Sequence, residues 1–347
     1  MDLHESEIRY NLKNMATRKR KSRRKSKKQN RFVEAFSVVL FLIVVSLAFL
    51  YFSGVRPKPA IETAVSSISE IIQAVEGSIP VEEHIPSPTS LRSELCDESD
   101  KEAYWEDLPL GLQIPMCPAV KAYESSKTVV GHEIQRYAGF TLCYREDYEL
   151  PEWVAYCITK NELAKEASRS NDFHFDTKIS TGSADPSDYT RSGFDRGHIA
   201  PAADMAFSAQ AMHDSFSMSN MTPQTPALNR GIWKNLEEQV RKWVSSFGAI
   251  YVIAGPVLDK KPSELKAIGK NAVSVPEEFY KVLLTKSGDS VIAVAFIFPN
   301  DKPKGSIWDY AVSVDEAEER TGLDFFYLLD DVLEKSAEKT FSPLDWN

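Results

Sequence analysis

The chain has 347 residues, enough for two average domains, and it carries 41 Lys and Arg against 50 Asp and Glu. The charge is unevenly divided, because residues 1–56 hold 13 basic and 4 acidic residues whereas the remainder holds 28 basic and 46 acidic residues. A protein that attracts nucleic acid through its overall charge is therefore excluded, since the acidic remainder repels a polyanion at long range.

Residues 32–55 form an apolar segment behind a basic tail, residues 1–31. No residue from Phe36 to Phe52 is charged, and a helix of about 20 residues crosses a hydrocarbon layer of ~30 Å. The tail is rich in Lys and Arg next to the segment, and such flanks stay on the cytoplasmic side of a membrane. We therefore expect a single-pass membrane protein with a cytoplasmic N-terminus and a body outside the cytoplasm.

Other interpretations of this N-terminal region stay open. The apolar segment also fits a signal sequence with a long basic leader. The basic run could bind anionic lipid or nucleic acid rather than only set the topology. For the membrane itself, the bacterial inner membrane is the first expectation and the mitochondrial inner membrane is the second.

Residues 56–104 mix Pro, Ser and Glu, which is typical of a linker or stalk. Within this linker, apolar residues recur at helical spacing: Ile61, Val65, Ile68, Ile72 and Val75. The spacing indicates a short amphipathic helix. It is either a solvated stalk segment or a stripe for self-association or partner recruitment, so a homodimer remains an open possibility.

Residues 105–347 have the pattern of one globular domain. Apolar, β-branched stretches predict strands over 133–144, 152–159, 249–258, 279–285 and 290–298. An apolar stripe predicts a helix over 231–248 that ends at Gly248, and Ser313 and Glu316 stand in capping-box register for another helix. Strands and helices are segregated rather than alternating, which favours a mixed α+β fold.

Four cysteines, Cys96, Cys117, Cys143 and Cys157, lie beyond the apolar segment, and none has the C-x-x-C spacing of a zinc knuckle. Outside the cytoplasm they permit disulfides in three connectivities. Cys143 and Cys157 flank a predicted hairpin and are expected to face one another across it. Free buried thiols are the alternative.

The tetrad "DRGH", residues 195–198, is the first candidate for chemistry. On an extended backbone Arg196 and His198 project to one side and Asp195 to the other, while Gly197 lets a ligand or another backbone come close. A neutral imidazole can take a proton from water, and a guanidinium can hold the charge of a phosphate. The alternative is a hydrogen-bonded polar turn without catalytic function.

Two residues around the helix at 231–248 form the second candidate. Asn229 precedes the helix, and Glu237 lies eight residues later, so both are expected to reach toward one rim of its N-terminal half. An amide oxygen and a carboxylate suit a hard cation such as Mg²⁺, which keeps several of its waters. The alternative is that Asn229 only caps the helix.

These stretches resemble the DNA/RNA non-specific endonuclease family, which includes endonuclease G. The motifs are residues 195–198, "SNMTPQ" at 219–224, Asn229, Trp233 and "LE" at 236–237. Similar stretches also occur at 151–160, at 188–194 and near the C-terminus, so that the resemblance covers about residues 130–330.

The resemblance implies a ββα-metal (His-Me finger) nuclease domain with a mixed antiparallel sheet, preceded here by the predicted transmembrane helix. A β-hairpin would present the histidine, and the following helix would carry the metal site. The implied roles are His198 as general base, Asn229 as the single protein ligand of Mg²⁺, Glu237 on metal-bound waters, Arg196 on the phosphate, Arg169 as a second phosphate arginine, and Asn220 as a residue that shapes the site. Asp195 is expected to brace the loop.

The expected function is therefore that of a membrane-anchored endonuclease that hydrolyses DNA and RNA with little sequence specificity. Mg²⁺ is the expected cofactor, with Mn²⁺ as a substitute. Basic residues near the motifs are expected to offset the acidic body: Arg169, Arg191, Arg196, Arg230 and Lys234. The alternative functions are a catalytically silent nucleic-acid-binding module on the membrane surface, for example in DNA uptake, and a structural anchor.

Overall fold

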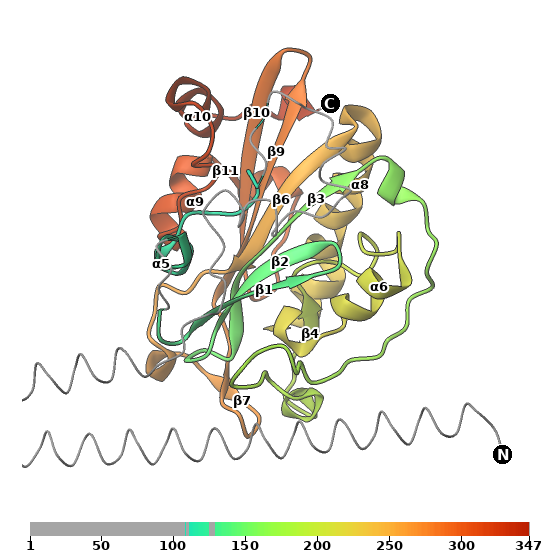
Figure 1. Ribbon diagram of the computed structural model, residues 1–347, viewed down its shortest axis with the longest axis vertical. Helices are drawn as coiled ribbons and strands as arrows, with labels where there is room; N and C mark the ends of the chain where they lie inside the picture. The colour runs from blue at the N-terminus through green and yellow to red at the C-terminus, as the bar shows by residue number, and fades with distance from the viewer. Residues whose placement is uncertain (1–107, 109–110, 125–128, 347) are drawn as a thin grey trace, which may run out of the picture. The chain divides into compact units, whose positions relative to one another are not determined.

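Seven strands form one antiparallel sheet in the order β1–β2–β3–β6–β9–β10–β11 (Figure 1). The structure is a computed structural model, and it describes residues 108, 111–124 and 129–346. The strands are β1 His132–Tyr137, β2 Phe140–Arg145, β3 Leu150–Thr159, β6 Ala249–Pro256, β9 Glu278–Ser287, β10 Ser290–Pro299 and β11 Ala311–Val312.

Four of the predicted strands match observed ones, and one prediction is wrong. The stretch 133–144 is a hairpin rather than a single strand, because β1 and β2 reverse direction at Ala138 and Gly139. Gly139 has a φ of 89°, and a Cβ there would lie 2.8 Å from Met205 and Phe207. The reversal therefore requires glycine at this position. Apolar residues continue on both sides of it, which hides the turn in the sequence.

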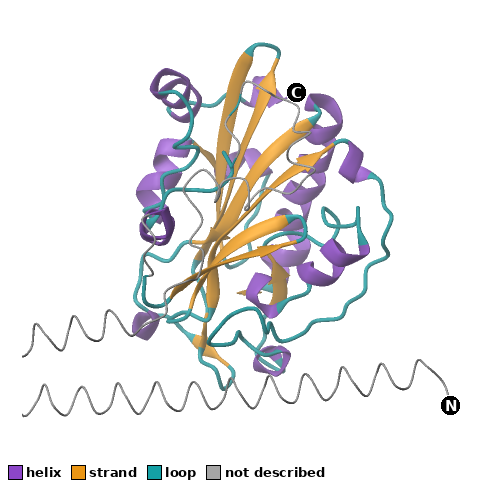
Figure 2. Cartoon of the chain, viewed as in Figure 1, coloured by secondary structure: helices purple, strands orange, loops and turns teal. Residues whose placement is uncertain are grey.

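Helices cover both faces of the sheet (Figure 2). On one face lies α8, Lys234–Phe247, and on the other lie α5, Pro118–Glu124, α9, Val314–Thr321, and α10, Asp331–Glu338. Strand β3 shows the consequence, because Val154, Tyr156 and Ile158 join the core under α8 while the residues between them join the other core. A strand that is buried on both faces is predominantly apolar, as β3 is apart from Glu152 and Thr159.

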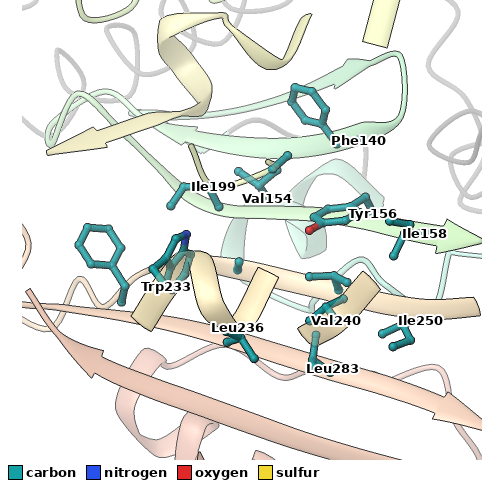
Figure 3. Packing of buried hydrophobic residues seen from close by; sticks show 14 of the residues in the cluster. Phe140, Val154, Tyr156, Ile158, Ile199, Trp233, Leu236, Val240, Ile250 and Leu283 are labelled. Atoms are coloured by element: carbon teal, nitrogen blue, oxygen red, sulfur yellow. The ribbon is translucent and has the colours of Figure 1, made fainter. Parts of the chain in front are cut away.

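Helix α8 packs on the sheet through its predicted apolar stripe. Leu236 and Val240 lie among side chains of β3, β6 and β9, including Tyr156 and Leu283 (Figure 3). The helix ends at Gly248, whose φ of 96° and N–H bond to the Val244 carbonyl confirm the predicted end. At the other terminus the helix is irregular, because α8 is preceded by the π-helical turn η4, Asn229–Trp233, in which Gly231 has non-helical φ/ψ.

A second, two-stranded antiparallel sheet pairs β4, Asp195–His198, with β5, Met221–Gln224. Helix α6, Ala209–Ser215, and the turn η3, Met218–Asn220, lie between these strands in sequence. The short helix α7, Pro226–Leu228, η4 and α8 follow β5 directly, which gives the expected ββα arrangement. The remaining elements are β7 Ala267–Ile268, β8 Val273–Ser274, and the 3₁₀ turns η1 Asn161–Leu163, η2 Pro186–Tyr189, η5 Pro262–Glu264, η6 Ile307–Tyr310 and η7 Pro343–Trp346.

Several predictions concern residues that the structure does not describe. The basic tail 1–31, the apolar segment 32–55 and the linker 56–104 with its apolar stripe lie outside the described residues. Among the described residues, none of the helices has the length and apolar character needed to cross a membrane.

The prediction that Cys143 and Cys157 face one another is wrong. Cys143 of β2 pairs in register with Trp153, whereas Cys157 lies four residues further along β3, opposite Tyr251 of β6. Cys117, Cys143 and Cys157 are buried and form no disulfide, while Cys96 lies outside the described residues.

Candidate active site

Two phenylalanine rings bring three of the predicted site residues together. Phe173 and Phe216 pack edge to face with ring centres 4.9 Å apart. The guanidinium of Arg196 lies 4.2 Å from the centre of the Phe173 ring, and that of Arg169 lies 5.0 Å from the centre of the Phe216 ring. The His198 imidazole packs against both rings, at 5.6 Å from Phe173 and 4.8 Å from Phe216. Arg169, Arg196 and His198 therefore surround one aromatic pair.

His198 is held as a neutral imidazole at the end of β4. Burial, together with the positive charges of Arg169 and Arg196, lowers its pKa to about 3. Its Nε2 atom is buried and has no hydrogen-bond partner among the described residues. An unsatisfied polar atom is costly in a folded protein, so its presence here is typical of a functional site.

The space that Gly197 leaves by having no side chain is filled by another side chain rather than by a backbone segment. A Cβ at Gly197 would lie 2.3 Å from the side chain of Gln224, across the β4–β5 pair. Gln224 is fully buried, and within the described part of the chain neither of its amide atoms has a hydrogen-bond partner. Close packing inside the hairpin therefore demands the absence of a side chain between Arg196 and His198.

Asp195 orients Asn229. Its Oδ2 accepts a hydrogen bond from Asn229 Nδ2 at 3.0 Å, and its two oxygens accept bonds from Arg230 at 2.7 and 2.6 Å. Burial raises the pKa of Asp195, but the bonds from Arg230 and Asn229 outweigh burial and lower it. With its amide nitrogen held in this way, Asn229 has a free carbonyl oxygen, since no described hydrogen bond uses it.

The alternative that Asn229 only caps the helix is wrong. Helical residues precede it in α7, where Thr225 provides the cap, and continue through η4 into α8. The prediction that Asn229 and Glu237 share a rim assumed a regular helix between them. The π-helical turn and the distorted Gly231 interrupt that regularity, so the relative position of the two side chains does not follow from the eight-residue spacing.

Glu237, in the first turn of α8, lies in a network of buried charges. Its pKa is raised to about 7, mainly by burial; Lys281 and Arg241 oppose the rise, and the neighbouring Asp204 adds to it. Asp204 itself pairs with Arg241 at 2.6 Å and accepts a hydrogen bond from Tyr156.

Lys281 of β9 is the cation that faces this network from the sheet. It is 1% exposed, its Nζ has no hydrogen-bond partner among the described residues, and it lies 4.7 Å from the centre of the Trp233 ring. Burial lowers its pKa, and the charges of Glu237 and Asp204 oppose that shift. A lysine inside the apolar stretch "FYKVLLT" was the signal for this residue, and the sequence reasoning overlooked it.

Asn220 is fully buried and positions the backbone after His198. Its Oδ1 accepts a bond from Ala200 N at 2.9 Å, and its Nδ2 donates to Ala200 O at 3.0 Å and to Ser215 O at 2.8 Å. These bonds tie the segment behind β4 to the end of α6. They fit a residue that shapes the site rather than one that contacts a substrate.

The predicted basic surroundings are only partly free to attract a substrate. Arg230 is paired with Asp195, and Lys234 lies 3.4 Å from Glu238. Arg169 and Arg196 instead lie over aromatic rings, which leave their charge uncompensated. The positive field of the site therefore comes mainly from the two arginines beside His198.

The chain is similar to known nucleases. A family model described as DNA/RNA non-specific endonuclease matches residues 119–332. The mitochondrial nuclease EXOG of Danio rerio is 35% identical over 211 residues, which cover 56% of this chain and 61% of that protein. Mitochondrial endonuclease G of Bos taurus is 33% identical over 205 residues, with 56% of this chain and 69% of that protein covered.

A bacterial relative and a solved structure agree with this. A nuclease of Nostoc sp. is 36% identical over 198 residues, which cover 54% of this chain and 70% of that protein. A chain in a crystal structure of the EndoG/EndoGI complex has a TM-score of 0.54 and 29% identity, and the match covers 58% of this chain and 88% of that one. The chain matches about three fifths, 61%, of the length of the EXOG nuclease of Danio rerio.

Proposed function

The chain belongs to the DNA/RNA non-specific endonuclease family, as its motifs predicted, and from this membership we propose that it is a metal-dependent endonuclease that hydrolyses phosphodiester bonds of DNA and RNA with little sequence specificity. The observation that carries the proposal is the convergence of Arg169, Arg196 and His198 on one pair of phenylalanines. This arrangement combines a proton acceptor with a phosphate clamp.

His198 acts as the general base. Because its imidazole is neutral and one ring nitrogen is unsatisfied among the described residues, it can accept a proton from an attacking water. A group whose pKa is about 3 is a weak base. The negative phosphate of a bound substrate offsets the fields of Arg169 and Arg196, which after burial are the remaining causes of the low value, so the pKa of His198 rises when substrate is bound.

Arg196 and Arg169 hold the phosphate. A guanidinium donates paired hydrogen bonds to phosphate oxygens and keeps its charge at every accessible pH. Since aromatic rings rather than carboxylates position both groups, their charge is available to the substrate. A clamp on phosphates reads no base edges, which supports low sequence specificity on DNA and RNA.

The donor set fits a hard divalent cation, for which we propose Mg²⁺ with Mn²⁺ as a substitute. Asn229 offers the carbonyl oxygen that Asp195 leaves free, and the half-buried Glu237 offers a carboxylate for bonds to metal waters. When bound, such a cation supplies positive charge for the phosphate and the departing oxygen. Cleavage is proposed to leave a 5′-phosphate.

For the whole chain we propose a single-pass membrane anchor at residues 32–55, with the nuclease domain on the outer side of a bacterial inner membrane. The apolar segment and the basic flank in the sequence support this proposal. Protease protection on membrane vesicles tests it. A nuclease domain that is digested only from the cytosolic side contradicts it.

The activity is tested with supercoiled plasmid DNA and single-stranded RNA in the presence of Mg²⁺. We expect cleavage of both, loss of cleavage with EDTA, and loss of nearly all cleavage in His198→Ala. His213→Ala, which removes a histidine of α6, is the matched control and retains activity. Binding of both nucleic acids without cleavage by the wild type would instead favour the silent binding module, and full activity of His198→Ala would remove the proposed base.

A further inference from the structure

A second group of metal-ligating side chains lies on the sheet face opposite α8. Cys143 belongs to β2, His132 begins β1 and Glu152 belongs to β3, so three adjacent strands each contribute one residue. Cys117 stands immediately before α5, which lies on the same side of the sheet as α9 and α10 (Figure 1). We propose that Cys117, His132, Cys143 and Glu152 bind one Zn²⁺ ion as a structural site.

The spacing of the donor atoms matches such a site. One ligand atom each of His132, Cys143 and Glu152 lies within 4.8 Å of the others, with 3.9 Å between Cys143 Sγ and His132 Nδ1 and 3.5 Å between His132 Nδ1 and Glu152 Oε2. Cys117 and Cys143 are in hydrogen-bond contact through their thiols. Neighbouring ligands on a tetrahedral zinc are about 3.5 Å apart, given zinc–ligand bonds of about 2.0–2.3 Å.

The two oxygens of Glu152 are held differently. Glu152 Oε1 accepts a 2.8 Å bond from Arg145, whereas Oε2 is buried, makes no hydrogen bond that meets the distance and angle criteria within the described residues, and has His132 Nδ1 as its polar neighbour at 3.5 Å. Arg145 is held in turn by Asp147. The carboxylate is thus fixed by one oxygen and offers the other toward His132, which is how a second layer of hydrogen bonds orients a metal ligand.

The charges balance when zinc is bound. Each thiol gives up its proton to solvent, so two thiolates and the Glu152 carboxylate provide three negative charges, which Zn²⁺ and the adjacent Arg145 offset. His132 and Glu152 are 13% and 14% exposed, so the ion can enter from solvent between them.

A site at this place would join distant parts of the chain. Cys117 precedes the strands, and β1 is an edge strand of the sheet with β2 as its only neighbour in the strand order. Four bonds to zinc would fix α5 and the β1 edge to the interior strand β3. The proposal concerns stability and does not depend on nuclease activity.

The test uses the full chain, purified in detergent under reducing conditions, with Co²⁺ as a spectroscopic probe for the zinc position. We expect one thiolate-bound Co²⁺ per chain, separate from Co²⁺ at the proposed nuclease metal site, with a thiolate-to-cobalt charge-transfer band that Zn²⁺ abolishes by displacement. Cys117→Ser and Cys143→Ser lose the band, while Cys157→Ser, which removes the buried thiol outside the group, retains it. Glu152→Gln keeps the shape of the side chain and weakens Zn²⁺ binding about 10- to 100-fold.

Two further results would overturn the proposal. The first is the absence of the charge-transfer band in wild-type protein whose free thiols have been verified by titration. The second is quantitative formation of a Cys117–Cys143 disulfide that Zn²⁺ fails to slow, which would make the two thiols a redox pair. Thermal melting provides an independent measurement, since Zn²⁺ raises the midpoint of the wild type and of Cys157→Ser but not that of Cys143→Ser.

Discussion

On the α8 face of the sheet burial shifts the pKa values of His198, Lys281 and Glu237, whereas on the face covered by α9 and α10 it shifts those of the carboxyl groups Glu318 and Glu338. The causes are the same, because burial disfavours every charged form. The consequences differ, because the α8 face combines its carboxyl group with the buried cation Lys281 and the neutral His198, whereas Glu338 has other carboxyl groups as its charged neighbours. The α8 face is therefore the better suited of the two to an anionic substrate.

The largest effect on activity is expected from removal of Arg196, which lies beside His198. Arg196→Ala deletes a guanidinium that an aromatic ring leaves unpaired, and we expect kcat/KM to fall by about 100- to 1,000-fold. Cleavage of a defined oligonucleotide measures the effect. Arg136→Ala, which removes an exposed arginine from β1, is the matched control, and an equal loss in both variants would show that overall charge rather than the clamp matters.

The next largest effect is expected from Asp195→Asn. The change removes the charge that holds Arg230 and orients Asn229, so activity should fall by about 10- to 100-fold and should recover in part at higher Mg²⁺. The Mg²⁺ concentration for half-maximal activity is the measurement. Asp289→Asn, at an exposed turn, should leave it unchanged, and an unaltered Mg²⁺ dependence of Asp195→Asn contradicts the positioning role.

Lys281→Met tests whether the charges around Glu237 affect activity independently of the two arginines that are proposed to hold the phosphate. Burial raises the pKa of Glu237 to about 7 and Lys281 opposes this shift, so loss of the lysine raises the pKa further. Because the ionised carboxylate is the useful form, activity at pH 7 should fall about tenfold and return as the pH approaches 9. The pH profile of kcat/KM tests this against Lys242→Met, and an unshifted acid limb would exclude the coupling.

The smallest effect is expected on the other face and concerns stability rather than activity. Burial, together with Glu318 and Glu334, raises the pKa of Glu338 to about 9. The folded state therefore keeps a proton that the unfolded state releases above its lower pKa, so stability falls as the pH rises from about 5 to about 9. Glu338→Gln should raise the free energy of unfolding at pH 8 by about 1 kcal/mol without changing nuclease activity.

Denaturant unfolding at pH 5 and pH 8 measures this difference. The gain should be present at pH 8, where the carboxyl group is protonated in the fold but ionised in the unfolded chain, and much smaller at pH 5, which lies close to the unfolded pKa. The exposed Glu319→Gln serves as the control. A gain of equal size at both values would show that folding does not raise the pKa of this carboxyl group.

Local patterns predicted much of the fold, and long-range contacts account for what was missed. Strands β6, β9 and β10 and the end of α8 follow from apolar runs and from Gly248, which are features of neighbouring residues. The hairpin at 133–144 was missed because its turn consists of Ala138 and Gly139 between two apolar stretches. The strand register likewise places Cys157 four residues along β3 from the partner of Cys143, and a single sequence does not reveal it.

The candidate site likewise combines residues that local motifs indicate with residues that only the fold brings together. His198, Arg196 and Asn229 could be named from motifs, but Phe173 and Phe216, which assemble the arginines around the histidine, carry no motif. Their role depends on the packing of a loop and the end of α6 against β4, and that packing is a property of the fold. Lys281 is different, because a lysine within a strand buried on both faces is a signal that sequence can provide.

The central claim is that His198 takes the proton of the attacking water, and chemical rescue tests it most directly. In His198→Ala the side chain is replaced by space at a buried position, into which free imidazole can diffuse. We predict that imidazole restores part of the single-turnover cleavage rate in this variant, that the restored rate rises with the fraction of neutral imidazole, and that the wild type gains nothing. Cleavage by His198→Ala at the wild-type rate without imidazole would contradict the account.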